Sequence, residues 1–342
     1  MPDHPIVSLL FFLIGLALIV KASDLFLDKA IWLARAYHIS ELVIGSTLVS
    51  LCTTLPEMVS GVVASLGNVG DMAVGNAVGS VICNTGLILG ILLLFTSVAI
   101  SREIFMLRGV FMLGTLTIAY ISITSPTELL MITRGEGVIF LVVLAIYLVV
   151  NYYESLHGGP IPLPAGGITP AAYRRSGQYE RSPKLLIRQL ALFFVAALGV
   201  VGGAWMLIAF GQRLARDIGI SDAVVSLLLI SLGTSLPELF TAIAAIRRKA
   251  HHISIGNIFG ANILNMSLVI GASATVRPLR PQDHFLRTVD IPFALSLGVV
   301  AFAFGVFKGK IGRHTGIVLI ALYLFYLASM FIVGRIGGAP TG

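Results

Sequence analysis

The chain has 342 residues, of which 57% are hydrophobic and 11% are charged, and its mean hydropathy is +0.96. This composition excludes a soluble globular domain and is typical of a polytopic α-helical membrane protein. The net charge of +7 does not indicate a nucleic-acid partner, because the basic residues fall in the loops between apolar segments.

Ten apolar segments approach the length that a helix needs to cross a bilayer, which is about 20 residues. The first lacks a basic stretch before its apolar run, so we interpret it as a retained span and not as a cleaved signal peptide. In chain order the segments are residues 6–32, 40–66, 72–98, 104–122, 137–152, 188–211, 222–246, 254–275, 289–307 and 312–333.

The distribution of basic residues predicts the orientation. With the N-terminus outside, the inner loops collect about twice as many Lys and Arg residues as the outer loops, as the positive-inside rule requires. The basic cluster at 277–287 falls on the outer side and runs against this trend. We therefore expect a multi-pass protein of the prokaryotic inner membrane with both termini extracytoplasmic.

An intramembrane acid occurs twice. Glu57 ends the hexapeptide CTTLPE and Glu238 ends GTSLPE, each inside an apolar run, where insertion scales assign an acid a cost of about 2.5–3.5 kcal/mol. When the chain is shifted against itself so that Glu57 falls on Glu238, VGNAVGSVICN also falls on IGNIFGANILN. Because Pro, Glu, Asn and Gly match as well as Leu and Val, we interpret the pattern as a duplication.

Each copy holds five spans, an odd number, so the second copy enters the membrane from the opposite side. We expect an all-α polytopic membrane protein whose ten transmembrane helices form two inverted-topology five-helix repeats, with a substrate site near the midplane between them. The expected domains are residues 1–152 with a repeat motif at 45–90, a cytoplasmic linker at 153–187, and residues 188–342 with the second motif at 226–271. The linker is rich in Gly, Pro and Arg, and we interpret it as a tether, with a regulatory role as the alternative.

The motifs place oxygen atoms at mid-depth in the membrane. With a helical rise of about 1.5 Å per residue, Thr53 and Thr54 reach the middle of the second span. Ser80 and Asn84 are one helical turn apart on one face of the third span. The second copy supplies matching positions from the other side: Thr234, Ser235, Glu238, Ala261 and Asn265.

Pro56 and Pro237 are expected to break their helices, so that backbone oxygens of Thr53 and Thr234 can face an ion. Oxygen ligands with two carboxylates suit a hard cation such as Ca²⁺ or Na⁺. The sequence has no mid-span His or Cys pair of the kind that zinc or copper prefers.

Other features of the spans receive structural interpretations. We expect Cys52 and Cys83 to be core residues without a disulfide. The glycines of 75–79 and 256–260 are interpreted as close-packing positions. Lys21, Asp24 and Asp28 are expected to form a local ion-pair cluster, with a cytoplasmic gate or ion entry as the alternative. These three residues are read from the sequence alone.

The paired motifs, CTTLPE with GNAVGSVICN and GTSLPE with GNIFGANILN, resemble the two repeats of the cation/Ca²⁺ exchanger superfamily. The chain is similar to prokaryotic sodium/calcium exchangers over nearly its whole length. The resemblance implies a secondary antiporter that exchanges Ca²⁺ for Na⁺ by alternating access. It also implies ion sites between the second, third, seventh and eighth helices, across which the first and sixth helices slide.

The resemblance assigns ligands by position. The carboxylates of Glu57 and Glu238 would hold Ca²⁺, together with the carbonyls of Thr53 and Thr234. Flanking Na⁺ sites would use side chains and carbonyls from five further residues: Thr54, Ser80, Ser235, Ser50 and Ser231.

The sequence also departs from the family pattern. Cys52 and Thr54 replace a glycine and a serine, which are mild changes. Asn84 and Asn265 would border the central position, and Asn265 stands where some prokaryotic members have Asp, which leaves the site two formal negative charges. Ala261 replaces a serine and removes a hydroxyl from one expected Na⁺ site, so Na⁺ coupling is open at this point.

The main alternative is an H⁺/Ca²⁺ exchanger of the same superfamily, in which protons would load Glu57 and Glu238 directly. Mn²⁺ or Mg²⁺ as the main cargo also stays open, and a passive cation channel is a weaker alternative. The sequence shows no nucleophile with its base, so we expect no enzyme. We expect no cofactor beyond the transported Ca²⁺ and Na⁺, no nucleic-acid partner, and a functional monomer in the lipid bilayer.

Overall fold

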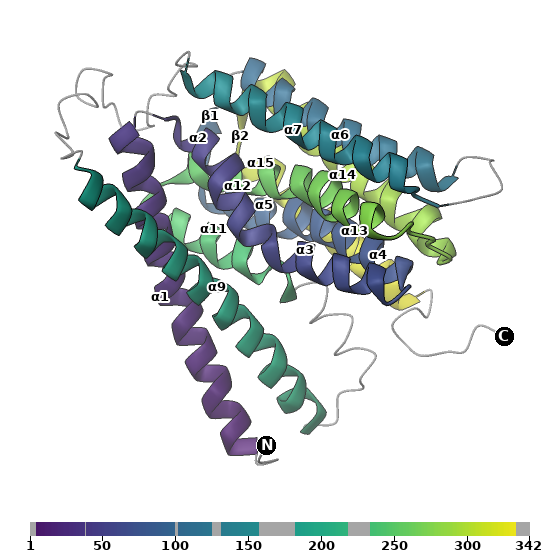
Figure 1. Cartoon of the computed structure of the whole chain (residues 1–342), viewed down its shortest axis with the longest axis horizontal. Coiled ribbons are helices and arrows are strands. Elements are labelled where there is room, and N and C mark those ends of the chain that lie inside the picture. The colour runs from purple at the N-terminus through teal and green to yellow at the C-terminus, as the bar shows by residue number, and fades with distance from the viewer. Residues whose placement is uncertain are drawn as a thin grey trace.

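The computed structural model describes residues 5–37, 39–99, 102–124, 131–156, 182–217 and 233–332. Almost all of these residues are helical (Figure 1). The first half contains α1 (Pro5–Tyr37), α2 (Glu41–Ile44), η1 (Gly45–Val49), α3 (Ser50–Leu66), α4 (Gly70–Ile82), η2 (Cys83–Ile88), α5 (Leu89–Phe95), β1 (Val98–Ala99), α6 (Arg102–Thr124) and α7 (Arg134–Leu156). The second half contains α9 (Pro183–Asp217), α11 (Leu236–Arg248), α12 (His251–Leu264), η3 (Asn265–Val269), α13 (Ile270–Val276), η4 (Leu286–Asp290), α14 (Ile291–Lys308), β2 (Lys310–Ile311) and α15 (Arg313–Ile332).

The long apolar helices of the structure agree with the membrane spans that the sequence predicts. Within the described ranges, 9 helices are long and apolar enough to cross a membrane, and each coincides with an expected span. The expected span 222–246 is described only in its second part, where α11 covers 13 residues, because residues 218–232 lie outside the described part of the chain. The protein is therefore an all-α polytopic membrane protein, as predicted.

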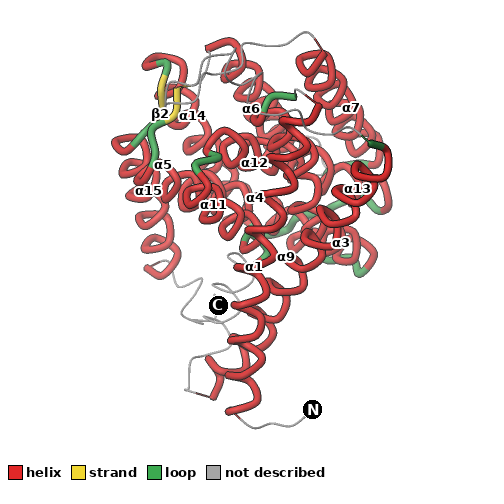
Figure 2. The backbone as a smooth tube through the Cα atoms, turned by 90° about the vertical axis from the view of Figure 1, so that its left-hand side faces the viewer, coloured by secondary structure: helices red, strands yellow, loops and turns green. Residues whose placement is uncertain are grey.

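Helices α1 and α9 lie side by side and project from the remaining helices (Figures 1 and 2). Phe11 stacks on Phe210 and Phe26 contacts Phe193, with ring centroids 4.8 and 4.6 Å apart. Residue numbers thus fall along α9 in the direction in which they rise along α1, so the two helices are antiparallel. Since they are the first helices of the two copies, this direction is the one that inverted repeats require.

The segment α2–η1–α3 runs parallel to α12–η3–α13. The Ser65 hydroxyl donates to the Ser273 carbonyl at 2.7 Å, and near the other end α12 lies against η1. A Cβ added at Gly256 would lie 2.3 Å from the Leu42 carbonyl oxygen, and one added at Gly260 would lie 2.6 Å from that of Ser46. The close-packing prediction for these two glycines is confirmed.

The close-packing expectation for Gly75 and Gly79 stays a prediction. No described atom outside their own helix lies within 4 Å of a Cβ built at either position, but residues 223–227, which the repeat offset places there, lie outside the described part of the chain. The short turn after α3 reverses the chain, so α4 runs opposite to α12, its counterpart in the second copy. The two motifs therefore cross the bundle in opposite directions.

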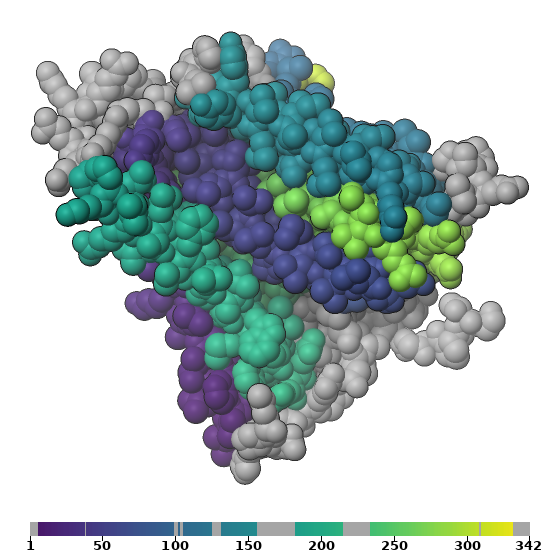
Figure 3. Space-filling model, in the orientation of Figure 1, coloured from purple at the N-terminus to yellow at the C-terminus, as the bar shows by residue number. Residues whose placement is uncertain are grey.

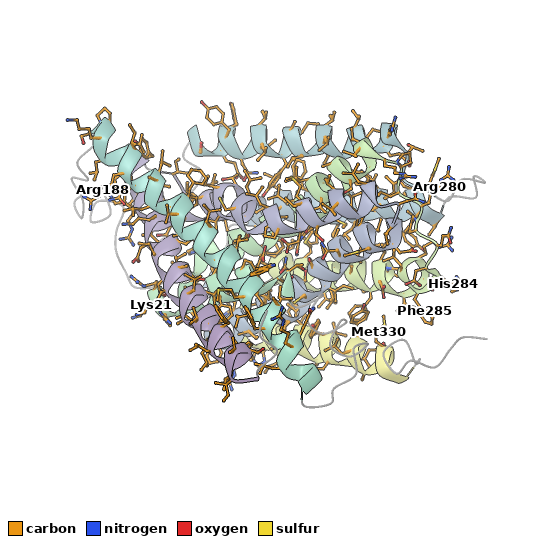
Figure 4. All side chains as sticks on the ribbon, turned by 60° about the horizontal axis from the view of Figure 1, so that its bottom comes forward. Lys21, Arg188, Arg280, His284, Phe285 and Met330 are labelled. Carbon is orange, nitrogen blue, oxygen red and sulfur yellow. The ribbon has the colours of Figure 1, made fainter. Side chains whose placement is uncertain are left out.

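Backbone pairings join the two copies at both ends of the bundle. Strands β1 and β2 pair antiparallel, with Val98 opposite Ile311. At the other end Ile132 and Leu279 exchange two backbone hydrogen bonds of 2.8 and 3.0 Å. Each pairing connects two loops that the sequence assigns to one side of the membrane. Figure 4 shows Arg188 and Arg280, which are assigned to different sides, at opposite ends of the molecule.

The predicted break at Pro56 is wrong, because α3 continues from Ser50 to Leu66 with this proline inside it. The irregular backbone lies about two to three turns before Pro56, in the π-helical turn η1 (Gly45–Val49), which widens the helix without ending it. In the second copy Pro237 lies at the start of α11, directly after a turn at Thr234 and Ser235. There the interruption is present as predicted.

Candidate cation-binding site

Two buried carboxylates form the centre of the candidate site. Glu57 on α3 and Glu238 on α11 are both 0% exposed, and their charges interact with each other. None of their four oxygen atoms has a partner in hydrogen-bond geometry in the described part of the chain. Two acids without donors in an apolar interior repel each other strongly. A bound cation would remove that repulsion.

Neutral oxygen and amide groups of the two repeat motifs are buried in the same way. Thr54, Asn84, Ser235 and Asn265 are each 1% exposed or less, and their polar side-chain atoms have no partner among the described residues. Such buried atoms cost free energy when they are left without a hydrogen bond. The concentration of these atoms in the two repeat motifs is a feature of a ligand site and not of a packed core.

Direct contacts bring several predicted site residues together across the copies. The hydroxyls of Ser80 on α4 and Thr234 lie 3.4 Å apart. Cys83, at the start of η2, lies against Ser235 and the two glutamates. Asn84 follows it in η2, and Asn265 begins η3 at the matching position of the second copy.

Two site residues were missed by the sequence reasoning. The Thr53 hydroxyl, which also lies beside Glu238, donates to the Asn257 side-chain oxygen at 3.2 Å. The Thr234 hydroxyl donates to that of Asn76 at 3.3 Å. Each threonine of one motif is thus held by an asparagine of the other. The signal was available, because the offset that matches the glutamates also matches these two asparagines.

The expected carbonyl ligands are described for one copy only. Ser50 is buried, and its carbonyl accepts the Thr53 hydroxyl at 3.2 Å, which occupies one of its two lone pairs. Ser231 lies outside the described residues. Ala261 is 0% exposed, so the position with the missing hydroxyl faces the protein interior.

The cysteine prediction is confirmed, because Cys52 and Cys83 are free thiols and both are buried. The ion pairs differ from the prediction. Asp24 and Asp28 do not form a cluster within α1, but pair with Arg247 and Arg248 at the end of α11. The reason is geometric, because α1 packs against α11 and both acids lie on one face of α1. These pairs connect α1 to the helix that carries Glu238.

Comparisons with known proteins agree with this arrangement. The model of the sodium/calcium exchanger protein family matches residues 7–153 and 188–332. The sodium/calcium exchanger MaX1 of Methanosarcina acetivorans is 27% identical over 96% of this chain and 99% of its own length. The inner membrane protein YrbG of Escherichia coli is 31% identical over 93% of this chain and 95% of its own length.

A solved structure resembles this fold. It is the sodium-calcium exchanger NCX_Mj soaked with 2.5 mM Na⁺ and 10 mM Sr²⁺, with a TM-score of 0.79 and 27% sequence identity. The match covers 95% of this chain and 99% of that one. With its family match in two blocks, its helical fold and its paired acidic motifs, the chain belongs to the sodium/calcium exchanger family of membrane antiporters.

Proposed function

We propose that this exchanger moves Ca²⁺ in one direction and Na⁺ in the other, by alternating access to a site between Glu57 and Glu238. One observation carries the proposal: four carboxylate oxygens without donors lie among buried hydroxyl and amide groups that also have no partner. A bound cation would interact favourably with all of these oxygen atoms at once. The names of MaX1 and NCX_Mj as sodium/calcium exchangers support Na⁺ as the counter-ion.

Within this proposal Ca²⁺ binds the two carboxylates and the carbonyls of Thr53 and Thr234. Asn76 and Asn257 are positioning residues, because each fixes the side chain of one of these threonines. Na⁺ takes the flanking oxygens of Thr54, Ser80, Ser235, Ser50 and Ser231, with Asn84 and Asn265 at the border of the central position.

The same proposal includes the organisation of the chain in the membrane. Two five-helix repeats, at 1–152 and 188–342, are joined by a cytoplasmic linker at 153–187, and both termini lie outside the inner membrane. The positive-inside bias supports this orientation. The location of Arg188 and Arg280 at opposite ends of the molecule supports only their assignment to different sides (Figure 4).

Transport of ⁴⁵Ca²⁺ into proteoliposomes tests the function. Vesicles loaded with Na⁺ and diluted into Na⁺-free buffer should accumulate Ca²⁺, and vesicles with equal Na⁺ on both sides should not. Accumulation without any gradient would contradict an antiporter. A dependence on a pH gradient with no response to Na⁺ would identify the proton-coupled alternative.

The proton-coupled alternative has a specific observation in its favour. Ala261 supplies no hydroxyl where the family pattern has a serine, which weakens one expected Na⁺ position. Glu57 and Glu238 could then be neutralised by protons when Ca²⁺ leaves. The Na⁺ and pH arms of the same experiment separate these two functions.

A further inference from the structure

Arg108 is a buried cation that the proposed ion site does not use. It lies within a membrane-spanning segment of α6 and is 2% exposed. It is the fourth residue of the span 105–124, near the end that the sequence assigns to the inner surface, where an arginine ordinarily extends its side chain towards water. Here the side chain is buried instead. Its position therefore requires a specific purpose.

The Arg108 side chain gathers three partners from two other spans. One of its terminal nitrogens donates to the Glu154 carboxylate at 3.1 Å and to the Asn151 side-chain oxygen at 3.1 Å, both on α7. The same nitrogen lies 3.4 Å from the Ser46 hydroxyl, on η1. We call Arg108, Glu154, Asn151, Ser46 and Tyr147 the Arg108 network.

The network holds the backbone of the π-helical turn. The Tyr147 hydroxyl donates to the Ser46 carbonyl at 3.0 Å, and the Asn151 amide donates to the Tyr147 carbonyl at 2.8 Å. On its other side the Ser46 carbonyl oxygen is pressed against Gly260 of α12. The turn η1 is thus fixed between α12 and the α6–α7 pair.

Hydrogen bonds continue from this turn to the candidate site. The Ser50 hydroxyl donates to the Thr47 carbonyl at 3.1 Å, and the Thr53 hydroxyl donates to the Ser50 carbonyl at 3.2 Å. Ser50 therefore lies one turn from the network, whereas Glu57 lies two turns further along α3. A displacement of η1 would move the Ser50 carbonyl first and the carboxylate least.

The corresponding positions of the second copy carry different side chains. The offset that matches the two glutamates places unrelated residue types at the positions that correspond to the arginine and its partners. In the order Ser46, Arg108, Tyr147, Asn151 and Glu154, the matching positions hold Leu227, Val289, Ala328, Ile332 and Arg335. The second copy instead buries the Asp290 carboxylate, which accepts a hydrogen bond from the Tyr326 hydroxyl at 3.1 Å. The residue types of the Arg108 network are therefore specific to the first copy.

We propose that Arg108 is a positioning residue that holds η1, and through it the Ser50 carbonyl, in place for Na⁺. This inference rests on the proposed function, in which that carbonyl is a Na⁺ ligand. It predicts that loss of Arg108 weakens Na⁺ binding more than Ca²⁺ binding, because the Ca²⁺ carboxylates lie further from the network. A residue needed only for stability would not discriminate between the two ions.

The test compares Arg108→Met with Arg102→Met, which removes an exposed arginine from the same helix. Half-saturating Na⁺ and Ca²⁺ concentrations are measured with purified full-length protein in proteoliposomes. Arg108→Met should raise the Na⁺ value by about tenfold, the low end of the effect of losing an outer-shell partner. The Ca²⁺ value should change by less than about twofold, and Arg102→Met should leave both values unchanged.

Two further single variants and one double variant cover the case in which Arg108→Met does not fold. Tyr147→Phe removes only the hydroxyl that binds the Ser46 carbonyl, and it should shift Na⁺ in the same direction by a smaller factor. Glu154→Gln leaves the Arg108 charge without its carboxylate, so it should reduce the yield of monodisperse protein, and the Arg108→Met, Glu154→Gln double variant should restore it.

Equal shifts for Na⁺ and Ca²⁺ in Arg108→Met and Tyr147→Phe, or no shift in either variant, would overturn the inference. The wild-type protein is measured first. A wild type without any Na⁺ dependence removes both this inference and the proposed function, whereas a Na⁺-dependent wild type with unshifted variants removes only the inference.

Discussion

The polar atoms without partners, not the carboxylates alone, distinguish this site at the scale of single residues. A buried acid can be a structural ion pair, but neither Glu57 nor Glu238 has a basic partner in the described part of the chain. The sequence was sufficient to find these acids, because a charge repeated within apolar runs is conspicuous. The repeat offset also matched Asn76 with Asn257, but it could not assign their role, because that role is a contact between helices that no local pattern encodes.

Replacing either glutamate tests the centre of the site. Glu57→Gln and Glu238→Gln keep the shape of the side chain but remove one of the two negative charges, so each should abolish Na⁺-driven ⁴⁵Ca²⁺ uptake. Glu136→Gln, at the start of α7 and outside the site, is the matched control and should retain transport. Normal uptake by either site variant would eliminate the proposed Ca²⁺ position.

The missing hydroxyl at Ala261 can be restored. Ala261→Ser adds an oxygen at a fully buried position of the second motif, so Na⁺ should compete better with Ca²⁺, by roughly the tenfold that one added hydrogen-bonding ligand of about 1.4 kcal/mol gives. Competition is measured as the Na⁺ concentration that halves ⁴⁵Ca²⁺ uptake. Ala274→Ser, another buried alanine of the same span, should have no effect, and an unchanged Ala261→Ser would mean that backbone or water already fills the position.

At the scale of helices, a prediction from the sequence was correct where it depended only on the helix itself. It was wrong where the structure depends on which other helices lie beside it. Spans were predicted well because long apolar runs have few alternatives in a bilayer. The break expected at Pro56 was wrong, because α3 tolerates this proline and η1 provides the irregular backbone instead. The ion pairs of α1 were placed within one helix, whereas their partners belong to α11, which lies in the other half of the sequence.

The contacts between α1 and α11 can be tested by charge reversal. Arg247→Asp places a second negative charge beside Asp24, and the two carboxylates should repel each other. The turnover rate should change, because this ion pair connects α1 to α11, which carries Glu238. An exposed pair contributes about 0.2–1 kcal/mol, so the rate should change by about 1.4- to fivefold. The Asp24→Arg, Arg247→Asp double variant should return towards the wild-type rate, and a double variant no better than the single one would show that the contact does not influence transport.

At the scale of the whole molecule, two related halves meet across the bundle in opposite directions. On the face of the molecule drawn in Figure 3, segments of both halves are in contact. The first half is purple and blue, and the second half is green. The repeat and its inversion followed from the sequence, because one constant offset between the motifs and an odd number of spans fix them. Which helices touch could not be predicted in this way, since apolar faces alone do not choose between neighbours.

The charge of the site predicts a response to membrane potential. If three Na⁺ ions exchange for one Ca²⁺, they leave one positive charge against the two carboxylates, whereas Ca²⁺ leaves none, so this 3:1 exchange would move net charge. Each 100 mV is worth about 2.3 kcal/mol per charge, which corresponds to about a 50-fold change in the Ca²⁺ gradient at equilibrium.

Valinomycin and K⁺ gradients set this potential in Na⁺-loaded proteoliposomes. An inside-positive potential should increase Ca²⁺ accumulation and an inside-negative one should decrease it, because one net charge leaves with the Na⁺. Electrically silent exchange would fit two Na⁺ per Ca²⁺ and would contradict the third Na⁺ ion.

The backbone pairings at the two ends of the bundle have a mechanical consequence. Residues 98–99 are tied to residues 310–311, and Ile132 is tied to Leu279, so the halves that carry the site cannot separate at either membrane surface without breaking main-chain hydrogen bonds. Among the described residues, none of these inter-repeat backbone pairings includes α1 or α9. Within the described part of the chain, α1 is therefore joined to the ion-carrying body through side chains, such as the Asp24–Arg247 and Asp28–Arg248 ion pairs, and not through main-chain hydrogen bonds.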